Sequence, residues 1–219
     1  MTLCGRIAGI KKDIVHEWHL YRSLLKMRST DLSRCKWVDE TKADYVEYHD
    51  NEWGVPVFDD RTFFEFLVLE SAQAGLSWYT ILKRREGYRI AFEHFDPKLV
   101  ATFDSEKVER LMENSAIIRN RAKIEAAINN AQCFLKVQST YGSFSEFIWA
   151  YVNGQPLDNR GVDDMPPATT ALSDKIAKDM KKLGFRFLGS TTIYAFLQAT
   201  GVINDHDMDC FCRSRNKHI

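Results

Sequence analysis

The chain has no net charge, since its 219 residues include 30 basic and 30 acidic side chains. A protein that holds nucleic acid by bulk electrostatics carries an excess of Lys and Arg, so this balance argues against a simple binder of that class. Only the charges that face a ligand matter, however, and charges of one sign do cluster locally. Basic clusters cover residues 83–85, 119–123 and 178–182, and acidic clusters cover residues 163–164 and 205–209, which predicts a dipolar surface.

Cysteine is sparse and long apolar runs are missing. The five cysteines are odd in number and scattered, and no signal peptide precedes them, which argues against a secreted disulfide framework. No apolar run approaches the ~20 residues that a membrane-spanning helix needs. We therefore expect a cytoplasmic protein with reduced thiols, some of which can bind metal.

Strand-like patterns and internal repeats are also poorly represented. The composition, 45% hydrophobic and 27% charged, is that of an ordinary globular protein. Helical periodicity and capping residues predict an all-α fold, with a loop over residues 153–170. The expected helices cover residues 60–75, 78–92, 105–114, 117–138, 144–152, 172–183 and 191–200.

Residues 1–33 form an N-terminal extension to the main domain, which we place at residues 34–219. Apolar residues recur at helical spacing in the extension and predict an amphipathic helix. Its acidic residues Asp13 and Glu17 argue against a transit peptide. This helix could dock on the domain, pair with another chain or be disordered, and the sequence does not decide among these. Its apolar residues are Ile7, Ile10, Ile14, Trp18, Tyr21 and Leu25.

Aromatic residues and one carboxylate gather in residues 45–56 (YVEYHDNEWGVP) and 69–78 (LESAQAGLSW). Glu70 lies in an otherwise apolar run, and a buried carboxylate is costly unless it has a partner or a function. The simpler interpretation is a surface glutamate near a helix end, and the apolar residues 67–69 argue against it. The aromatic side chains suit a flat, electron-poor ligand.

Two Cys/His pairs form a candidate metal site. His206 and Cys210 are four residues apart, so on a helical turn both project to one side. Cys35 and His49 supply a second pair near the start of the domain, and Cys2His2 is a standard zinc set. The simpler interpretation is a loop histidine and a packed cysteine. Spacing alone leaves rival ligands, namely Cys4, His16, His19, Cys212 and His218.

A helix, a tight turn at residues 115–116 and a second helix are predicted over residues 106–124. The second helix starts beside Arg119, Arg121 and Lys123. Free N–H groups at a helix start, together with three cations, can hold a phosphate without reading base sequence. A solvated helix face with ordinary charge alternation is the simpler interpretation.

Several strings, in this order, resemble the bacterial 3-methyladenine DNA glycosylase I family of the helix-hairpin-helix superfamily. The resemblance runs from about residue 34 to residue 216, nearly the whole chain after the extension. The strings are residues 48–54 (YHDNEWG), 73–78 (QAGLSW), 184–189 (GFRFLG) and 204–206 (NDH).

The resemblance implies a helix-hairpin-helix fold with a structural zinc ion that ties the two ends of the domain together. The family's zinc ligands fall on Cys35, His49, His206 and Cys210. The implied activity is hydrolysis of the N-glycosidic bond of N3-methyladenine in alkylated double-stranded DNA, which releases free 3-methyladenine. We expect a monofunctional enzyme without lyase activity, acting as a monomer at the nucleoid.

The resemblance also assigns roles in base flipping, in which the damaged base leaves the stack and enters a pocket. Gly75 and Leu76 form a turn that wedges into the gap. A methylated, cationic adenine is attracted to aromatic faces by ~1–2 kcal/mol when desolvated. Tyr48 and Trp78 are the expected stacking partners, and the remaining pocket walls are expected from Trp37, Tyr45 and Trp53.

Glu70 is the expected catalytic-site carboxylate. It would accept hydrogen bonds from the amino edge of the base and offset its charge, with water activation as a further role. Many relatives in the superfamily place a catalytic aspartate one helix after the hairpin. Between Lys123 and Ser145 the only acidic residue is Glu125, too close to the hairpin for that role. Lys123 is expected to contact phosphate rather than to form a Schiff base.

Two features depart from the family pattern. The extension is one, and Ala116 is the other, because family members often have glycine at the hairpin turn. A left-handed turn would be costly for alanine. Two other functions are weighed against the glycosylase: a zinc-stabilised protein that binds DNA lesions without cutting, and a helical interaction domain that uses the N-terminal helix.

Overall fold

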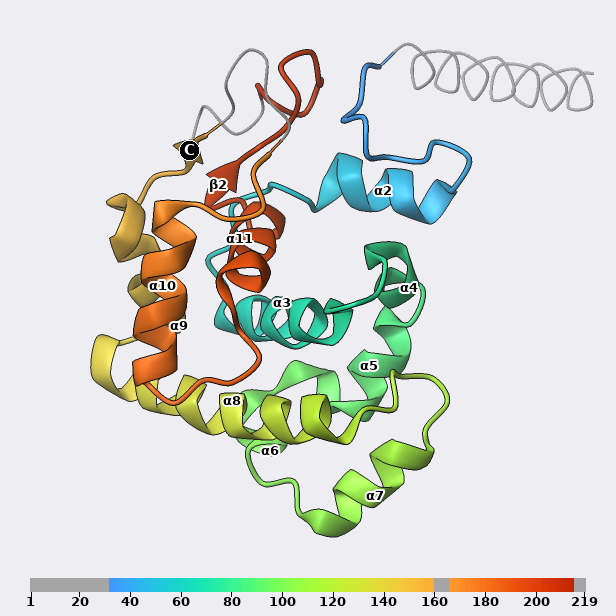
Figure 1. The fold of residues 1–219 in the computed structure, drawn as a ribbon, viewed down its shortest axis with the longest axis vertical. Coiled ribbons are helices and arrows are strands. Elements are labelled where there is room, and N and C mark those ends of the chain that lie inside the picture. Colours follow the sequence, from blue (N-terminus) through green and yellow to red (C-terminus); the bar gives the residue numbers. More distant parts are fainter. Residues whose placement is uncertain (1–31, 160–165, 215–219) are drawn as a thin grey trace, which may run out of the picture.

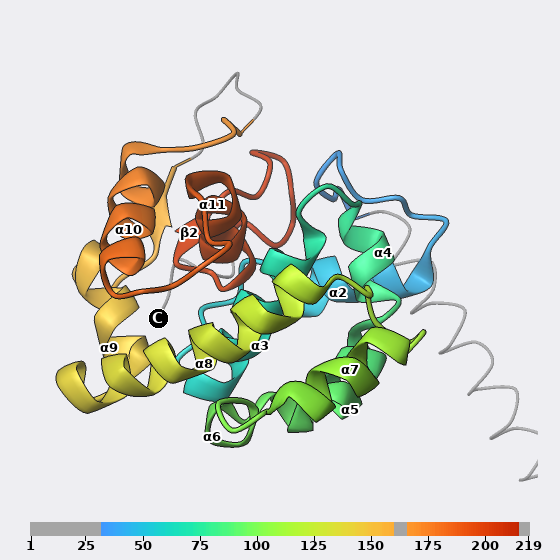
Figure 2. The ribbon, with the colours of Figure 1, turned by 60° about the horizontal axis from the view of Figure 1, so that its bottom comes forward.

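The structure, a computed structural model, describes residues 32–159 and 166–214. It is almost entirely helical, as predicted (Figures 1 and 2). The α-helices are α2 (Ala43–Asn51), α3 (Asp60–Gln73), α4 (Trp78–Leu82), α5 (Arg85–Ala91), α6 (Pro97–Val100), α7 (Ser105–Glu113), α8 (Arg121–Tyr141), α9 (Phe144–Trp149), α10 (Ala171–Lys182) and α11 (Ser190–Ala199). Single 3-10 turns form η1 (Glu93–Phe95) and η2 (Ala150–Val152).

Helix α3 is the centre of the core. Figures 1 and 2 place it between α11 and α8, and it also contacts α9, α4 and α5. Ten consecutive residues of α3, from Phe63 to Ala72, are buried, as expected for a helix covered on all sides. The Asp59 side chain accepts a hydrogen bond from the Thr62 N–H and begins the helix where the sequence predicts. A polar side chain between Phe63 and Ala72 is therefore buried and needs a partner.

Helix boundaries are where the predictions fail most often. The single helix expected over residues 78–92 is two helices, α4 and α5, which break at Lys83 and Arg84. Helix α8 begins at Arg121 rather than at residue 117, because the Asn120 side chain caps it by accepting from the Lys123 N–H at 3.1 Å. Residues 114–120 thus form a longer turn than the two residues expected, and Arg119 precedes the helix.

Two short strands lie outside the all-helical prediction. Strand β1 (Leu157–Asp158) falls in the predicted loop and pairs in parallel with β2 (Ile203–Asn204), with Leu157 opposite Ile203. Arg213 donates to the Asp158 carboxylate at 2.6 Å and reinforces this pairing. The strands hold the segment after α11 in place next to the candidate site. Helix α2, which periodicity and caps do not predict, carries Tyr48 and His49.

The hairpin turn is built without glycine. Ala116 does not have a positive φ, so the predicted cost of a left-handed alanine is wrong for this turn. The Asn114 side chain accepts from the Ala116 N–H at 2.9 Å, and the Tyr88 hydroxyl accepts from the Ile118 N–H at 3.1 Å. The glycine that this turn needs lies instead on α5. Gly87 packs so close to the turn that an added Cβ would lie 2.5 Å from the Ala116 carbonyl oxygen.

The predicted N-terminal helix lies outside the described residues, as do Cys4, His16, His19 and His218. Within residues 32–159 and 166–214, no helix has the length and apolar character needed to cross a membrane.

Candidate active site and metal centre

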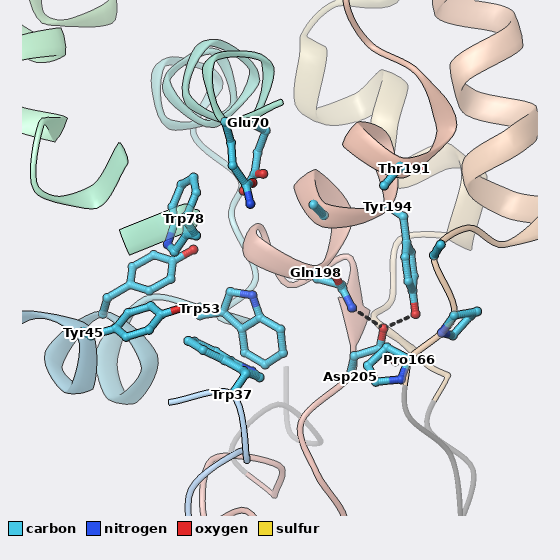
Figure 3. A pocket seen from close by; sticks show the side chains of 15 residues that line it. Trp37, Tyr45, Trp53, Glu70, Trp78, Pro166, Thr191, Tyr194, Gln198 and Asp205 are labelled. Carbon is cyan, nitrogen blue, oxygen red and sulfur yellow. Dashed lines mark hydrogen bonds between the residues drawn. The ribbon is translucent and has the colours of Figure 1, made fainter. Parts of the chain in front are cut away.

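A cavity of about 330 Å³ lies between α2, α3, α4 and α11, a volume near the lower end of the range for small-molecule sites (Figure 3). All five aromatic residues predicted to bind a base line it, together with Glu70. The full lining is Trp37, Tyr45, Tyr48, Trp53, Glu70, Gln73, Trp78, Pro166, Pro167, Ala168, Thr191, Tyr194, Ala195, Gln198 and Asp205. The structure therefore brings together residues from the beginning and the end of the domain.

Two carboxylates are buried on α3, and their surroundings differ. Glu65 accepts from Arg85 at 2.7 Å and from Arg89 at 3.1 Å, so it is a satisfied structural residue. Glu70 is 5% exposed, and its Oε2 has no hydrogen-bond partner among the described residues. Desolvation raises the pKa of Glu70 to about 8. The prediction that Glu70 is not a surface residue is confirmed.

One wall of the cavity is aromatic. The rings of Tyr48 and Trp78 lie 5.4 Å apart between centroids at a tilt of 42°, and Phe66 stacks behind Trp78 at 6.5 Å. The Trp37 ring lies 5.1 Å from that of Tyr45 and 5.0 Å from that of Trp53. The indole N–H groups of Trp37 and Trp78 have no acceptor among the described residues. The wall thus offers π faces and two donors to a ligand.

The opposite wall was not predicted from the sequence. It is formed by Tyr194 and Gln198 on α11 and by Asp205, which directly follows β2 (Figure 3). The Asp205 Oδ2 accepts hydrogen bonds from the Tyr194 hydroxyl and, at 2.9 Å, from Gln198 Nε2. A signal for this wall exists in the sequence, because Thr191, Tyr194 and Gln198 recur at helical spacing on one face of α11.

The four predicted metal ligands converge in one buried cluster. Donor atoms of Cys35, His49, His206 and Cys210 all lie within 4.8 Å of one another. His206 Nδ1 is 3.4 Å from Cys35 Sγ and 3.5 Å from Cys210 Sγ, and His49 Nε2 is 3.5 Å from Cys210 Sγ. Spacing alone left Cys212 as a rival, and its sulfur lies close to His49 and Asp50 in a second, overlapping group.

Buried polar groups orient His49, the histidine of the cluster on α2. His49 Nδ1 lies 2.8 Å from the Asp50 carboxylate, and the Arg34 guanidinium donates to the same carboxylate at 2.8 and 2.9 Å. A carboxylate on the second ring nitrogen is the usual outer partner of a metal-binding histidine, because it fixes the tautomer and the ring orientation. His49 Nε2 is thereby left to face the cysteines.

The Cys/His cluster and the cavity share a wall. The Trp53 ring meets His206 edge-on at 4.7 Å, and the Trp37 ring lies 5.3 Å from His49. Along the chain, Trp37 is two residues after Cys35 of the cluster, and Asp205 directly precedes His206 of the cluster. The cluster therefore positions side chains on both sides of the cavity.

The predicted wedge lies in the turn between α3 and α4. Gly75 has φ +83°, and a Cβ placed on it would meet nothing within 4 Å, so its backbone is open to solvent or to a ligand. The next side chain, Leu76, is 40% exposed. The Ser77 side chain then accepts from the Thr80 N–H and begins α4. An apolar side chain thus projects from a turn whose backbone is accessible.

The three predicted phosphate-binding cations lie in different surroundings. Arg119 lies in the turn before α8, and Arg121 pairs with Glu109 across the hairpin at 2.7 Å. Lys123 does not extend into solvent: its Nζ donates to the carbonyl oxygens of Ala72 at 2.9 Å and Ala74 at 2.7 Å. Burial lowers the pKa of Lys123. The lysine therefore connects the hairpin to the wedge turn.

Comparison with known proteins places this geometry in a family. The sequence profile described as methyladenine glycosylase matches residues 37–213. The DNA-3-methyladenine glycosylase 1 of Escherichia coli is 46% identical over 188 residues, which are 85% of this chain and all of that protein. The DNA-3-methyladenine glycosylase of Haemophilus influenzae is 46% identical over 83% of this chain and 98% of its own length.

Solved structures agree with the sequence comparison. A crystal structure of 3-methyladenine DNA glycosylase I matches with a TM-score of 0.79 at 49% identity, covering 82% of this chain and 99% of that one. The Staphylococcus aureus enzyme, whose structure addresses recognition of 3-methyladenine, matches with a TM-score of 0.79 at 40% identity, covering 83% and 97%. The profile match over most of the described domain and these identities establish that the chain belongs to the methyladenine glycosylase family.

Proposed function

We propose that this protein hydrolyses the N-glycosidic bond of N3-methyladenine in alkylated duplex DNA and releases 3-methyladenine. The observation that carries the proposal is Glu70, a buried carboxyl group that faces an aromatic wall and has one oxygen without a partner in the part of the chain that the structure describes. Burying an acid without a hydrogen-bond partner costs free energy, and a bound ligand that supplies the partner would offset that cost. The relatives' names, and one relative's structure on 3-methyladenine recognition, support that choice of ligand.

Charge complementarity explains how this pocket would select a methylated base. With a pKa of about 8, Glu70 is mostly protonated at neutral pH in the empty cavity. N3-methylation places a positive charge on adenine in DNA, and such a base stabilises the ionised carboxylate. The π faces of Tyr48 and Trp78 add a cation–π contribution of ~1–2 kcal/mol. Unmethylated adenine carries no charge, so it would leave Glu70 protonated and gain neither contribution.

The chemistry itself requires little acid catalysis, because the methylated base is already cationic. When the C1′–N9 bond breaks, its electron pair moves to the base and neutralises it, while the sugar becomes oxocarbenium-like. Water then bonds to C1′ and loses a proton. We assign Glu70 to recognition and electrostatic stabilisation in this step. We expect a monofunctional enzyme without lyase activity.

For DNA engagement we assign the wedge to Gly75 and Leu76 and the phosphate contacts to Arg119 and Arg121. Leu76 is exposed enough to enter the gap that a flipped base leaves. Lys123 would hold the wedge turn in place rather than contact phosphate directly, since its amine already donates to two carbonyl oxygens. We expect a monomer acting on chromosomal DNA at the nucleoid.

We further propose that Cys35, His49, His206 and Cys210 hold a structural zinc ion. Zn–S and Zn–N bonds of ~2.3 and ~2.05 Å at a tetrahedral angle place sulfur and nitrogen about 3.5 Å apart. The three short sulfur–nitrogen distances in the cluster, 3.4 to 3.5 Å, match that spacing. Four protein ligands close the coordination shell, so the ion supplies rigidity to the pocket walls rather than chemistry.

The test is release of 3-methyladenine from methylated duplex DNA by wild type and by Glu70→Gln and Trp78→Ala, with Glu125→Gln as the control. Glu125 is an exposed carboxylate on α8, away from the cavity. We expect release by wild type and the control and a loss of about 10²-fold or more in the two pocket variants. Tight binding of lesion DNA by zinc-loaded wild type without release would instead identify a lesion-binding protein. Absence of both would favour a helical interaction domain.

A further inference from the structure

A second carboxylate faces the cavity, and the proposed recognition of the base leaves it unexplained. Asp205 is 2% exposed, yet its Oδ1 has no hydrogen-bond partner among the described residues. Figure 3 draws Asp205 on the wall opposite Trp78, apart from Glu70. A buried acceptor that is left without a donor is costly. The cavity is lined by Asp205, so its missing partner can come from a bound ligand or water.

The other oxygen of Asp205 is held in a fixed position. Gln198 Nε2 and the Tyr194 hydroxyl both donate to Oδ2, and Asn159 Nδ2 donates at 3.1 Å to the same hydroxyl. The backbone is fixed as well, since Asp205 follows the paired strand β2. The hydrogen bonds to Oδ2 and the fixed backbone keep Oδ1 from turning toward another partner. This is the arrangement expected of a preorganised site.

The donors that a flipped nucleotide can offer are few. Within a DNA strand the 3′ and 5′ oxygens of deoxyribose are esterified, so the sugar has no hydroxyl group to donate. The amino group of the base would be used by Glu70 in the proposed function. A water molecule is then the remaining donor, and the sugar, as it becomes oxocarbenium-like, is the remaining positive charge.

Resting on the proposed function, we infer that Asp205 is a second catalytic residue, whose Oδ1 holds the attacking water and faces the cationic sugar. The C1′–N9 bond breaks with its electrons passing to the base. The water oxygen held by Asp205 bonds to C1′, and the resulting oxonium loses its proton to bulk water. Tyr194 and Gln198 are positioning residues, because they fix the carboxylate and do not touch the reacting atoms. Glu70 thus acts on the base, and Asp205 acts on the water and the sugar.

The experiment compares wild type with Asp205→Asn, a change that keeps the shape of the side chain and removes its charge. Single-turnover release of 3-methyladenine from methylated duplex DNA is measured alongside zinc content and binding of free 3-methyladenine by tryptophan fluorescence. We expect release to slow by about 100-fold. Free-base affinity should change by less than about threefold, because the product has no sugar for Asp205 to act on. Asp209→Asn is the control, since Asp209 lies on the same loop, is exposed and accepts from Ser33 at 2.9 Å.

Three outcomes overturn the inference. Release by Asp205→Asn within threefold of wild type removes any catalytic role, and a parallel loss of free-base affinity reassigns Asp205 to base recognition. If Asp205→Asn does not fold or loses zinc, Tyr194→Phe decides, since it keeps the ring and removes one hydrogen bond to Oδ2. We expect that variant to lose about three- to tenfold in release rate at unchanged free-base affinity, and an unchanged rate overturns the inference. Absence of release by wild type would count against the proposed function itself.

Discussion

Lys123 Nζ donates to the Ala74 carbonyl oxygen at 2.7 Å, which joins the first turn of α8 to the end of α3. The same amine donates to Ala72, so one cation satisfies two carbonyls that the helix end leaves without partners. Gly75 and Leu76 follow directly. The hairpin that would hold the DNA backbone and the turn that would enter the stack are therefore connected by a single side chain.

Replacing Lys123 with Met should weaken base flipping without altering the pocket. The change removes two charge-assisted hydrogen bonds, each worth ~1.5–3 kcal/mol, and frees the wedge turn. We expect excision from methylated duplex DNA to fall by about tenfold or more, while affinity for free 3-methyladenine stays the same. The control is Lys136→Met, an exposed lysine on the same helix. Equal losses in free-base binding and excision would contradict the assignment, because they would indicate general unfolding.

Glu70 should make the protein less stable as the pH rises. Its carboxyl group has a pKa of about 8 when folded against an ordinary value of 4.5, so between these values the folded state keeps a proton that the unfolded state loses. Folding then takes up a proton, and the free energy of unfolding falls by up to ~1.4 kcal/mol per pH unit before levelling off above pH 8. Urea denaturation of wild type and Glu70→Gln from pH 5 to 8 tests this. The variant should be relatively more stable at the upper end, and identical pH slopes would refute the expectation.

Removal of the metal should destroy the cavity as well as the cluster. Trp37 and Trp53 pack against the proposed ligands His49 and His206, so losing the ion would free both the aromatic wall and the loop that carries Asp205. We expect about one zinc per chain by elemental analysis. Cys210→Ser or a strong chelator should lower both thermal stability and free-base affinity. Cys133→Ala is the control, because Cys133 is a buried thiol outside the cluster. Full free-base binding by a metal-free protein would contradict the structural role.

Gly87 should be intolerant of a side chain. A Cβ at this position would lie 2.5 Å from the Ala116 carbonyl oxygen and 2.7 Å from the Ala116 Cβ, closer than atoms pack. Gly87→Ala must push the hairpin away from α5, at a cost of ~1–3 kcal/mol in the free energy of unfolding. Affinity for duplex DNA should fall with it. The double variant Gly87→Ala, Ala116→Gly should recover part of the loss by removing one clashing atom. A fully stable single variant would show that the contact can relax.

The aromatic side of the site could be predicted from the sequence because its residues are close together along the chain. Tyr48 and Trp53 lie on or beside one helix, and Glu70 is conspicuous as an acid within an apolar run. The all-helical fold followed from periodicity and caps in the same way. These patterns are local in the sequence, and the structure shows the helices and the aromatic wall that they predict.

The Asp205 wall could not be predicted for the opposite reason. Asp205 belongs to a string that carries the family resemblance. Helical spacing places Tyr194 and Gln198 on one face of α11, but it does not say which part of the molecule that face meets. Their convergence depends on how α11 packs on α3, which is a long-range property. Lys123 was likewise expected to contact phosphate, because a sequence shows a cation at a helix start and not the carbonyl groups that face it.

Cys35 and Trp37 stand at the beginning of the domain, whereas Asp205, His206 and Cys210 stand near its end. A ribosome must therefore complete the chain through Cys210 before either the metal cluster or the cavity can exist. Partial translation products, and chains clipped near the C-terminus, would lack one wall of the pocket and two of the four proposed metal ligands. The two ends of the domain therefore become functional together, and an unfinished copy is expected to bind neither the base nor the metal.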